Sequence, residues 1–194
     1  MQPVLRNVMK AVLVLTGTLV FPAISLAQRV EACDSPEARE FDFWIGDWTI
    51  EQQILGQDGT WLSFDARTSV SSTLEGCAII EHWQGTVQFF WEGMDAPEPM
   101  SGLSVRAYDP DTDAWYISWM DTRTPRFGGP YVGGFDGSRG EFLREWETEQ
   151  GKRSGRITFS NITSDSVDWE LAISSDEGDS WSTVWIMKMY RTRQ

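Results

Sequence analysis

The chain has little of what metal, nucleic-acid and membrane proteins require. Its 194 residues include two cysteines and one histidine, which are too few for a Cys/His zinc cluster. Basic residues are scarce, because 16 Lys and Arg stand against 29 Asp and Glu and give a formal net charge of −13. Such a charge offers no broad surface for DNA, RNA or anionic lipid. After the N-terminus, no stretch reaches the roughly 18 apolar residues of a membrane span. We therefore expect no metal, no nucleic-acid partner and no transmembrane span.

Catalytic and cofactor motifs are missing as well. The sequence holds no G-x-S-x-G elbow, no P-loop and no dinucleotide-binding glycine fingerprint. A Ser-His-Asp triad or a haem site would have to be built around His82, and no second signal for either lies near it. We expect no cofactor and interpret His82 as a surface or structural histidine.

Residues 1–27 have the pattern of a secretory signal peptide. They contain two basic residues and no acid, then the apolar run AVLVLTGTLVFPAI, and they end in the small-x-small sequence Ser25-Leu26-Ala27. The pattern predicts cleavage after Ala27 and a periplasmic or secreted mature domain formed by residues 28–194. The alternative is an uncleaved membrane anchor.

Export would place the two cysteines in an oxidising space, where Cys33 and Cys77 can pair. In the chain-entropy model a bridge that closes a loop of about 45 residues contributes on the order of 4 kcal/mol. The alternative is two free thiols, one of them buried.

From residue 41 onward, short segments rich in aromatic and β-branched residues alternate between apolar and polar positions and are separated by turn signals. The pattern predicts strands near residues 47–55, 60–72, 77–84, 101–109, 114–121, 131–135, 140–148, 153–161, 165–174 and 181–192. Because the connections are short, strands adjacent in sequence should pair as an antiparallel up-and-down meander. About ten such strands would close into an all-β barrel with a central cavity. A two-sheet sandwich of the same strands is the alternative.

Two stretches interrupt this rhythm. Residues 85–100 bring the aromatic cluster Phe89-Phe90-Trp91 and two prolines, and we expect a long loop or flap at a barrel end. Its aromatic side chains would either form a lid over a cavity or plug their own end of the barrel. Residues 122–140 hold six glycines and predict a bulged or short strand.

The segment Ser174–Trp181 fits the S-x-D-x-G-x-[ST]-W pattern known as an Asp box, which occurs in sialidase-type propellers. A propeller needs several blades and a far longer chain, so one copy predicts a hairpin turn. In that turn Asp176 should accept backbone N–H bonds, Gly178 should take the unusual dihedrals, and Trp181 should pack beneath.

The octapeptide at residues 41–48 (FDFWIGDW) resembles the FDFW-[IL]-G-x-W lead of a widespread family of secreted bacterial lipocalin-like proteins of unknown function. The resemblance continues through residues 74–83, 104–110, 115–119, 174–181 and 190–191 and so covers nearly the whole mature chain. It implies a lipocalin-like (calycin or fatty-acid-binding-protein-like) barrel with no agreed activity. This chain departs from the family pattern in its 85–100 insert and in the spacing before Ser174.

The residues of this lead also have a physical interpretation of their own. Phe41, Phe43, Trp44 and Trp48 should form an apolar knot that plugs one end of the barrel, while Gly46 permits a tight turn into the first strand. The alternative is that the knot contacts a ligand.

Five residues are candidates for ligand contact. The period of two places Glu81 and Trp83 on one face of their strand, and Arg106 and Tyr108 on one face of theirs. The two charges could orient a polar ligand head across a cavity while Trp83 and Trp119 hold its apolar body. The alternative is that both charges face solvent as a cross-strand pair.

These observations favour an exported protein that binds a small, largely apolar or amphipathic molecule in the barrel cavity. A second hypothesis is a small-molecule enzyme, an isomerase or hydrolase, that uses Glu81 as general acid or base. A third is an envelope protein-interaction module whose contact surface is the aromatic 85–100 loop.

Overall fold

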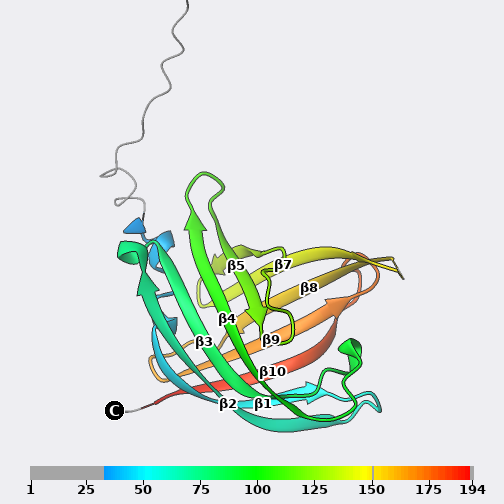
Figure 1. Cartoon of the computed structure of the whole chain (residues 1–194). Helices are drawn as coiled ribbons and strands as arrows, with labels where there is room; N and C mark the ends of the chain where they lie inside the picture. Colours follow the sequence, from blue (N-terminus) through cyan, green and yellow to red (C-terminus); the bar gives the residue numbers. More distant parts are fainter. Residues whose placement is uncertain (1–32, 150, 193–194) are drawn as a thin grey trace, which may run out of the picture.

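Ten antiparallel strands, connected in sequence order, close into a barrel in the computed structural model, which describes residues 33–149 and 151–192 (Figure 1). The strands are β1 (Gly46–Leu55), β2 (Trp61–Thr73), β3 (Ala78–Val87), β4 (Glu98–Asp109), β5 (Ala114–Asp121), β6 (Tyr131–Asp136), β7 (Arg139–Thr148), β8 (Gly151–Ser160), β9 (Ser166–Ser174) and β10 (Ser182–Arg191). Short 3₁₀ helices flank them: η1 (Glu37–Arg39), η2 (Asp42–Trp44), η3 (Leu74–Gly76) and η4 (Phe90–Glu92). β1 pairs with β10 and so closes the sheet. The predicted up-and-down barrel is confirmed, and the sandwich alternative is wrong.

The predictions for residues 1–27 lie outside the residues that the structure describes. The predicted signal peptide, residues 1–27, precedes the described residues, as does the cut after Ala27. Within the described part of the chain, no helix is long and apolar enough to cross a membrane. Export therefore stays a prediction.

The ten strands lie where the alternating pattern predicts them, and the main difference is at the 85–100 segment. β3 continues to Val87 and β4 begins at Glu98. Three pairs of residues that were expected in the loop, from Gly85–Met100 to Val87–Glu98, therefore belong to the ladder between β3 and β4. The irregular segment shortens to residues 88–97. Pro99 is compatible with the longer strand because it lies near the strand's first residue, where a missing N–H is tolerated.

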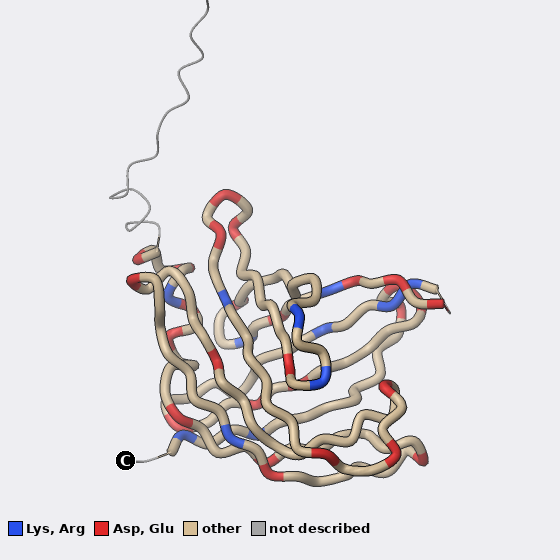
Figure 2. The backbone as a smooth tube through the Cα atoms, viewed as in Figure 1, with Lys and Arg blue, Asp and Glu red and all other residues tan. Residues whose placement is uncertain are grey.

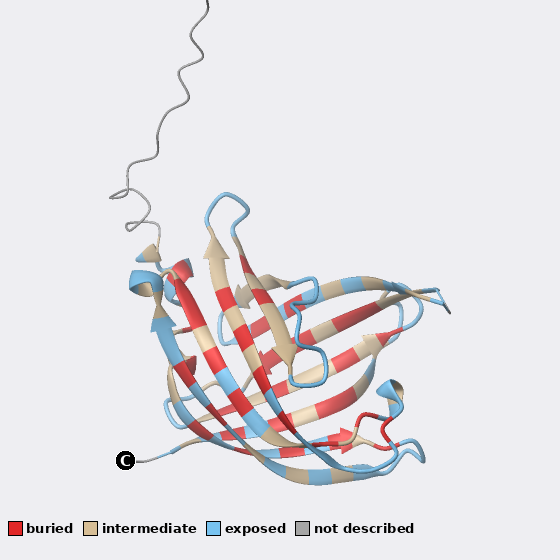
Figure 3. Cartoon of the chain, viewed as in Figure 1, coloured by how far each residue is buried: buried red, intermediate tan, exposed pale blue. Residues whose placement is uncertain are grey.

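Burial alternates along the strands with the predicted period of two (Figure 3). In β1 the side chains of Trp48, Ile50 and Ile54 are at most 1% exposed, while Glu51 and Gln53 between them face solvent. The inner faces of the strands together form one hydrophobic core. This burial is the main favourable contribution to folding.

The residues of the FDFW lead close one end of the barrel. The Phe41 ring is fully buried and lies 4.9 to 5.5 Å, between ring centroids, from four aromatic residues on β5 to β8: Trp115, Phe135, Phe142 and Phe159. Trp44 and Trp48 stack at 5.7 Å, and the Trp48 indole donates a hydrogen bond of 2.8 Å to the Trp44 carbonyl. The predicted apolar plug is therefore confirmed.

The barrel wall has its shortest ladder between β5 and β6. Three residue pairs join these strands, from Trp115–Gly133 to Ile117–Tyr131, whereas eight pairs join β4 to β5. The ladder between β6 and β7 ends at Val132–Leu143. Beyond these points residues 122–130 lie between the ends of β5 and β7 and contact both strands. The expected short strand in the glycine-rich stretch is thus present as β6.

The Asp-box segment forms the predicted turn between β9 and β10. Asp176 accepts hydrogen bonds from the Ser174 hydroxyl and from the backbone and hydroxyl of Ser180. These bonds lower the pKa of Asp176 to about 2. Gly178 has a φ of +97°, and the Trp181 ring packs against it.

Cys33 and Cys77 form a disulfide whose Cα atoms are 4.8 Å apart. The bridge ties the lead before η1 to the residue just before β3, at the plugged end of the barrel. The predicted pairing is confirmed, and the free-thiol alternative is wrong.

We expect Phe41→Ala to lower the free energy of unfolding by about 3 to 5 kcal/mol, because it removes the ring around which the plug packs. Urea unfolding followed by tryptophan fluorescence measures the change. Leu143→Ala on the outer face of β7, where the side chain is 46% exposed, is the control and should change stability by less than about 0.5 kcal/mol. Equal effects of the two substitutions would contradict the plug's role.

Reduction of the Cys33–Cys77 bridge, or its removal by Cys33→Ser/Cys77→Ser, should lower stability by on the order of 4 kcal/mol while leaving the β-sheet signal in circular dichroism intact. The loop that the bridge closes spans a sequence separation of 44 residues. Thermal unfolding with and without reductant tests this expectation. An unchanged midpoint would show that the bridge does not constrain the unfolded chain.

Candidate functional site

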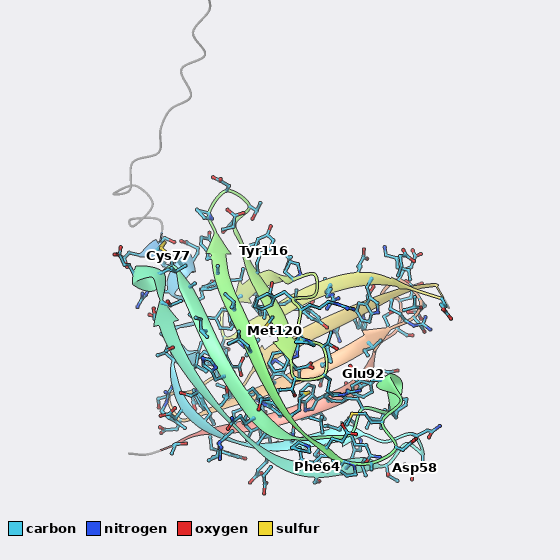
Figure 4. The ribbon with its side chains drawn as sticks, viewed as in Figure 1. Asp58, Phe64, Cys77, Glu92, Tyr116 and Met120 are labelled. Carbon is cyan, nitrogen blue, oxygen red and sulfur yellow. A yellow bond between two sulfur atoms is a disulfide. The ribbon has the colours of Figure 1, made fainter. Side chains whose placement is uncertain are left out.

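A cavity of about 400 Å³ lies inside the barrel, between the plug and the 88–97 segment. Its wall is strongly aromatic, since seven of the chain's eleven tryptophans contribute to it: Trp44, Trp83, Trp91, Trp119, Trp146, Trp169 and Trp185. In Figure 4 Cys77 marks the plugged end of the barrel and Glu92 the opposite end. A cavity of this size and lining matches those that hold small organic ligands.

Four of the five predicted ligand contacts line this cavity. Glu81 and Trp83 project from β3, Arg106 from β4 and Trp119 from β5. Glu81 and Arg106 are 4% and 3% exposed, so the alternative in which both charges face solvent is wrong. The fifth candidate, Tyr108, is not part of the lining.

Tyr108 lies nearer the β4–β5 hairpin. Its hydroxyl donates a 2.6 Å hydrogen bond to Asp113 Oδ1, and its ring centroid is 5.9 Å from that of Trp115. The bond to Asp113 is the main cause that raises the pKa of Tyr108 to about 12. Alternation gave the correct face of β4 but not the depth, because two residues along a strand shift a side chain by roughly 7 Å.

The Glu81 carboxylate is fully engaged by donors from neighbouring strands. Its Oε2 accepts a 2.5 Å bond from Arg106 Nη2 and a 2.9 Å bond from the Ser104 hydroxyl. Its Oε1 lies 3.0 Å from the Thr68 hydroxyl on β2. The ion pair and two neutral donors thus join β2, β3 and β4 inside the barrel.

The Arg106 guanidinium lies where the plug meets the cavity. Its central carbon is 5.1 Å from the Phe41 ring, 4.9 Å from Trp44 and 5.6 Å from the ring of Phe159. Burial lowers the pKa of Arg106, and the charge of Glu81 opposes this shift. Cation–π contact therefore supplements a single charge partner.

Two contacts fix the orientation of Trp119. Its indole N–H donates a 2.9 Å hydrogen bond to Asp121 Oδ2. Its ring lies against the Cα of Gly102 on the paired strand, where an added Cβ would come within 2.0 Å of ring carbons. Glycine at residue 102 is therefore required for this ring to lie flat on the cavity wall.

Sequence reasoning missed Trp185 and the residue that holds it. Gln52 is 1% exposed, and its Oε1 accepts a 2.8 Å bond from the Trp185 indole while its Nε2 donates to the Thr86 carbonyl. Trp185 contacts Phe89 of the 88–97 segment at 5.0 Å, and Trp91 stacks on Phe89 at 4.9 Å. Two of the three aromatic residues of this segment thus face the cavity, while Phe90 is 37% exposed.

Arg144 is a second cavity arginine that sequence reasoning missed. Its guanidinium carbon lies 5.9 Å from the Tyr131 ring and 5.5 Å from the Trp146 ring. Its nitrogens approach the Cα of Gly128 so closely that an added Cβ would come within 2.9 Å of Nη1. Desolvation raises the pKa of Tyr131 to about 12, and the charge of Arg144 opposes the rise. The alternation Phe142, Arg144, Trp146 could have placed this arginine on an inner face.

The opposite end of the cavity carries further charges. Glu92 of η4 pairs with Arg123 at 2.5 Å and so links the 88–97 and 122–130 segments. Asp121 accepts the backbone N–H groups of Arg123 and Thr124 besides the Trp119 indole. Many other Asp and Glu residues lie at the hairpin ends around the barrel (Figure 2).

His82 lies on the outer face of β3 and is exposed, away from the cavity. It cannot serve as a haem ligand or a catalytic base inside the barrel. Within residues 33–149 and 151–192, no group of His, Cys, Asp and Glu residues is arranged to hold a metal ion.

No family model and no curated protein matches the sequence. Solved structures nevertheless share the fold. The S-type phycobiliprotein lyase CPES from Guillardia theta is 12% identical, with a TM-score of 0.51 over 81% of this chain and 93% of that one. The Rv2717c protein from M. tuberculosis is 9% identical, with a TM-score of 0.52 over 82% of this chain and 99% of that one. The chain therefore has a lipocalin-like barrel fold, and at such identity the likeness extends to the fold alone.

We expect Glu81→Gln to destabilise the protein by about 3 to 5 kcal/mol, because it leaves the buried Arg106 charge without a partner. A cycle with Arg106→Gln and the double variant should give a coupling energy well above zero in urea unfolding. Glu145→Gln is the matched control, since Glu145 pairs with Lys152 at a solvent-exposed site and should cost less than about 1 kcal/mol. A loss at Glu81 no larger than at Glu145 would contradict the structural role of the pair.

Proposed function

We propose that the protein binds a small, largely apolar molecule in the barrel cavity. The observation that carries the proposal is the cavity of about 400 Å³, whose wall contains seven tryptophans. The Trp185 ring contacts Trp83 and Trp169 edge to face, at 5.8 and 5.2 Å between ring centroids, so the wall is preformed. A preformed apolar wall limits the ordering that binding requires.

We also propose that the mature chain is exported and belongs to the lipocalin-like family with the FDFW lead. The signal-peptide pattern of residues 1–27 supports export, and so does the Cys33–Cys77 disulfide, because such bridges persist in oxidising compartments. Family membership is supported by the place of the lead residues, which form the plug that a shared fold would need.

The enzyme hypothesis has less support. One structural neighbour is named a lyase, so the fold does host an enzyme. In this chain, however, three donors engage the Glu81 carboxylate, and the ion pair with Arg106 lies beside the plug. This arrangement favours a structural role for Glu81 over proton transfer to a substrate.

The interaction-module hypothesis is also weakened by the aromatic segment. Phe89 is 4% exposed and Trp91 lines the cavity, so two of the three rings are turned inward. Only Phe90 of the cluster offers an exposed ring to a partner. The segment is better suited to cover the cavity than to bind a protein.

Native mass spectrometry of the protein purified gently from the organism that makes it tests the binding proposal. We expect one stoichiometric small-molecule adduct, which is lost on refolding from denaturant and restored when the released compound is added back. Binding should quench tryptophan fluorescence. Trp169→Ala should weaken rebinding about tenfold or more, because it removes a ring from the cavity wall. Trp61→Ala is the control and should leave rebinding unchanged, because Trp61 is 39% exposed and does not line the cavity.

The binding proposal would be overturned if the protein from its native source showed only the mass of the chain, without an adduct, and if it bound no compound from a whole-cell extract. Equal loss of binding in Trp169→Ala and Trp61→Ala would show that the compound binds outside the barrel.

A further inference from the structure

Buried donors without partners are concentrated around the cavity. Among the described residues, six buried side-chain nitrogens lack a hydrogen-bond partner, and five of them belong to residues that line the cavity: Trp44 Nε1, Trp83 Nε1, Arg106 Nε, Arg106 Nη1 and Arg144 Nε. All five are N–H donors. Native proteins leave few buried polar groups unpaired, so such a cluster needs an explanation.

Two carboxylates that line the cavity, those of Glu81 and Asp121, already accept hydrogen bonds. Glu81 accepts from three donors, and the Asp121 carboxylate accepts from the Trp119 indole and two backbone N–H groups. The amide oxygen of Gln52 accepts from Trp185. The wall therefore presents donors in excess, and a ligand that supplies oxygen acceptors would complement it.

Arg144 is the strongest of these donors because its charge has no counter-ion. Arg106 is paired with Glu81, whereas no acid in the described part of the chain lies within ion-pair distance of Arg144, and no hydrogen bond joins Arg144 to a described residue. The rings of Tyr131 and Trp146 and the backbone of Gly128 hold the guanidinium in place. A preorganised guanidinium in an aromatic setting binds carboxylates and similar oxyanions well.

The Glu92 carboxylate does not neutralise this charge, because it is paired with Arg123. Asp121 also lines the cavity but lies beyond ion-pair distance of Arg144 and has its own donors. Arg144 is partly exposed and lines the cavity without an acidic partner among the described residues, in a chain whose net charge is −13.

We propose that the ligand is an amphipathic organic anion whose carboxylate-like head binds Arg144 and whose apolar body lies against Trp83, Trp169 and Trp185. This inference rests on the proposed binding function and specifies the ligand class. The head group and Arg144 form a charge-assisted pair, and the remaining donors of the wall accommodate further oxygens of the ligand. Neutral and cationic molecules of the same shape bind less well.

Three unbranched probes with ten carbons each separate the head group from the body: decanoate, decan-1-ol and decylamine. Calorimetric titration of the disulfide-bonded protein should give decanoate about 10 to 100-fold tighter binding than decan-1-ol, as expected for a hydrogen-bonded charge pair. Decylamine should bind most weakly, although the net charge of the protein would favour it. A second pair, naphthalene-acetate and naphthalene-ethanol, extends the comparison to an aromatic body.

Arg144→Met should abolish the preference for decanoate and leave decan-1-ol affinity within about threefold. Arg156→Met is the matched control, because Arg156 also lies over a tryptophan, 4.5 Å from the Trp181 ring, and also has a buried unpartnered Nε, but it does not line the cavity. Arg144→Lys, which keeps the charge, should retain part of the preference.

The outcomes separate the two proposals. If the alcohols bind and the carboxylates bind no better, the head-group assignment is overturned while the binding function stands; this comparison needs no variant. If the preference survives in Arg144→Met, the anion site lies elsewhere and the assignment is overturned. If no probe of either series binds, the binding function itself is contradicted and the assignment falls with it.

Discussion

The burial of one guanidinium organises the interior of this barrel. Arg106 cannot lie inside an aromatic core without compensation, because an isolated buried charge is very costly. The Glu81 carboxylate supplies the counter-charge, Ser104 and Thr68 donate to that carboxylate, and the plug rings cover the guanidinium face. The plug, the ion pair and the cavity floor are therefore one connected structure. A change in any of them alters the support of the other two.

The second constraint is the short ladder between β5 and β6. Because β6 ends its pairing at Ile117–Tyr131, the wall beyond that point consists of residues 122–130, which run without a ladder. Glycine at residue 128 leaves room for the Arg144 guanidinium beside the backbone. The irregular wall thus creates the one place where a cation can lie inside the barrel without an acidic partner among the described residues. In a regular ladder, side chains of the neighbouring strand would fill this space.

Much of the fold could be predicted from the sequence because barrel strands have a simple pattern. One solvated face and one buried face give a period of two, and turn residues separate the strands. The plug was predictable for the same reason, since four aromatic residues before the first strand need a core to enter. The pattern failed where depth mattered. Tyr108 shares a face with Arg106 but lies nearer the plugged end, and alternation does not show how far along the barrel a residue lies.

Arg144 was missed for a different reason. The sequence does not reveal that the β6–β7 ladder ends at Leu143, just before this arginine, or that Gly128 lies against its guanidinium. Gln52 was missed because a single amide on an inner face gives no sign of its partner. Such residues depend on contacts between distant segments, which a single sequence does not encode in local patterns. The charged groups of the site are therefore less predictable than its aromatic wall.

The two cavity arginines define what kind of selectivity this wall can exert. An apolar wall alone discriminates weakly, because a missing or added methylene changes binding only modestly. A guanidinium without a counter-ion discriminates more strongly: a ligand that fills the cavity without an acceptor would cover the Arg144 charge and leave it uncompensated. Arg106 exerts no such selection, since Glu81 already neutralises it. The same residue type is therefore paired within the fold at one depth and, in the proposed complex, binds the anionic head of the ligand at another, and the difference lies in whether the chain itself provides the anion.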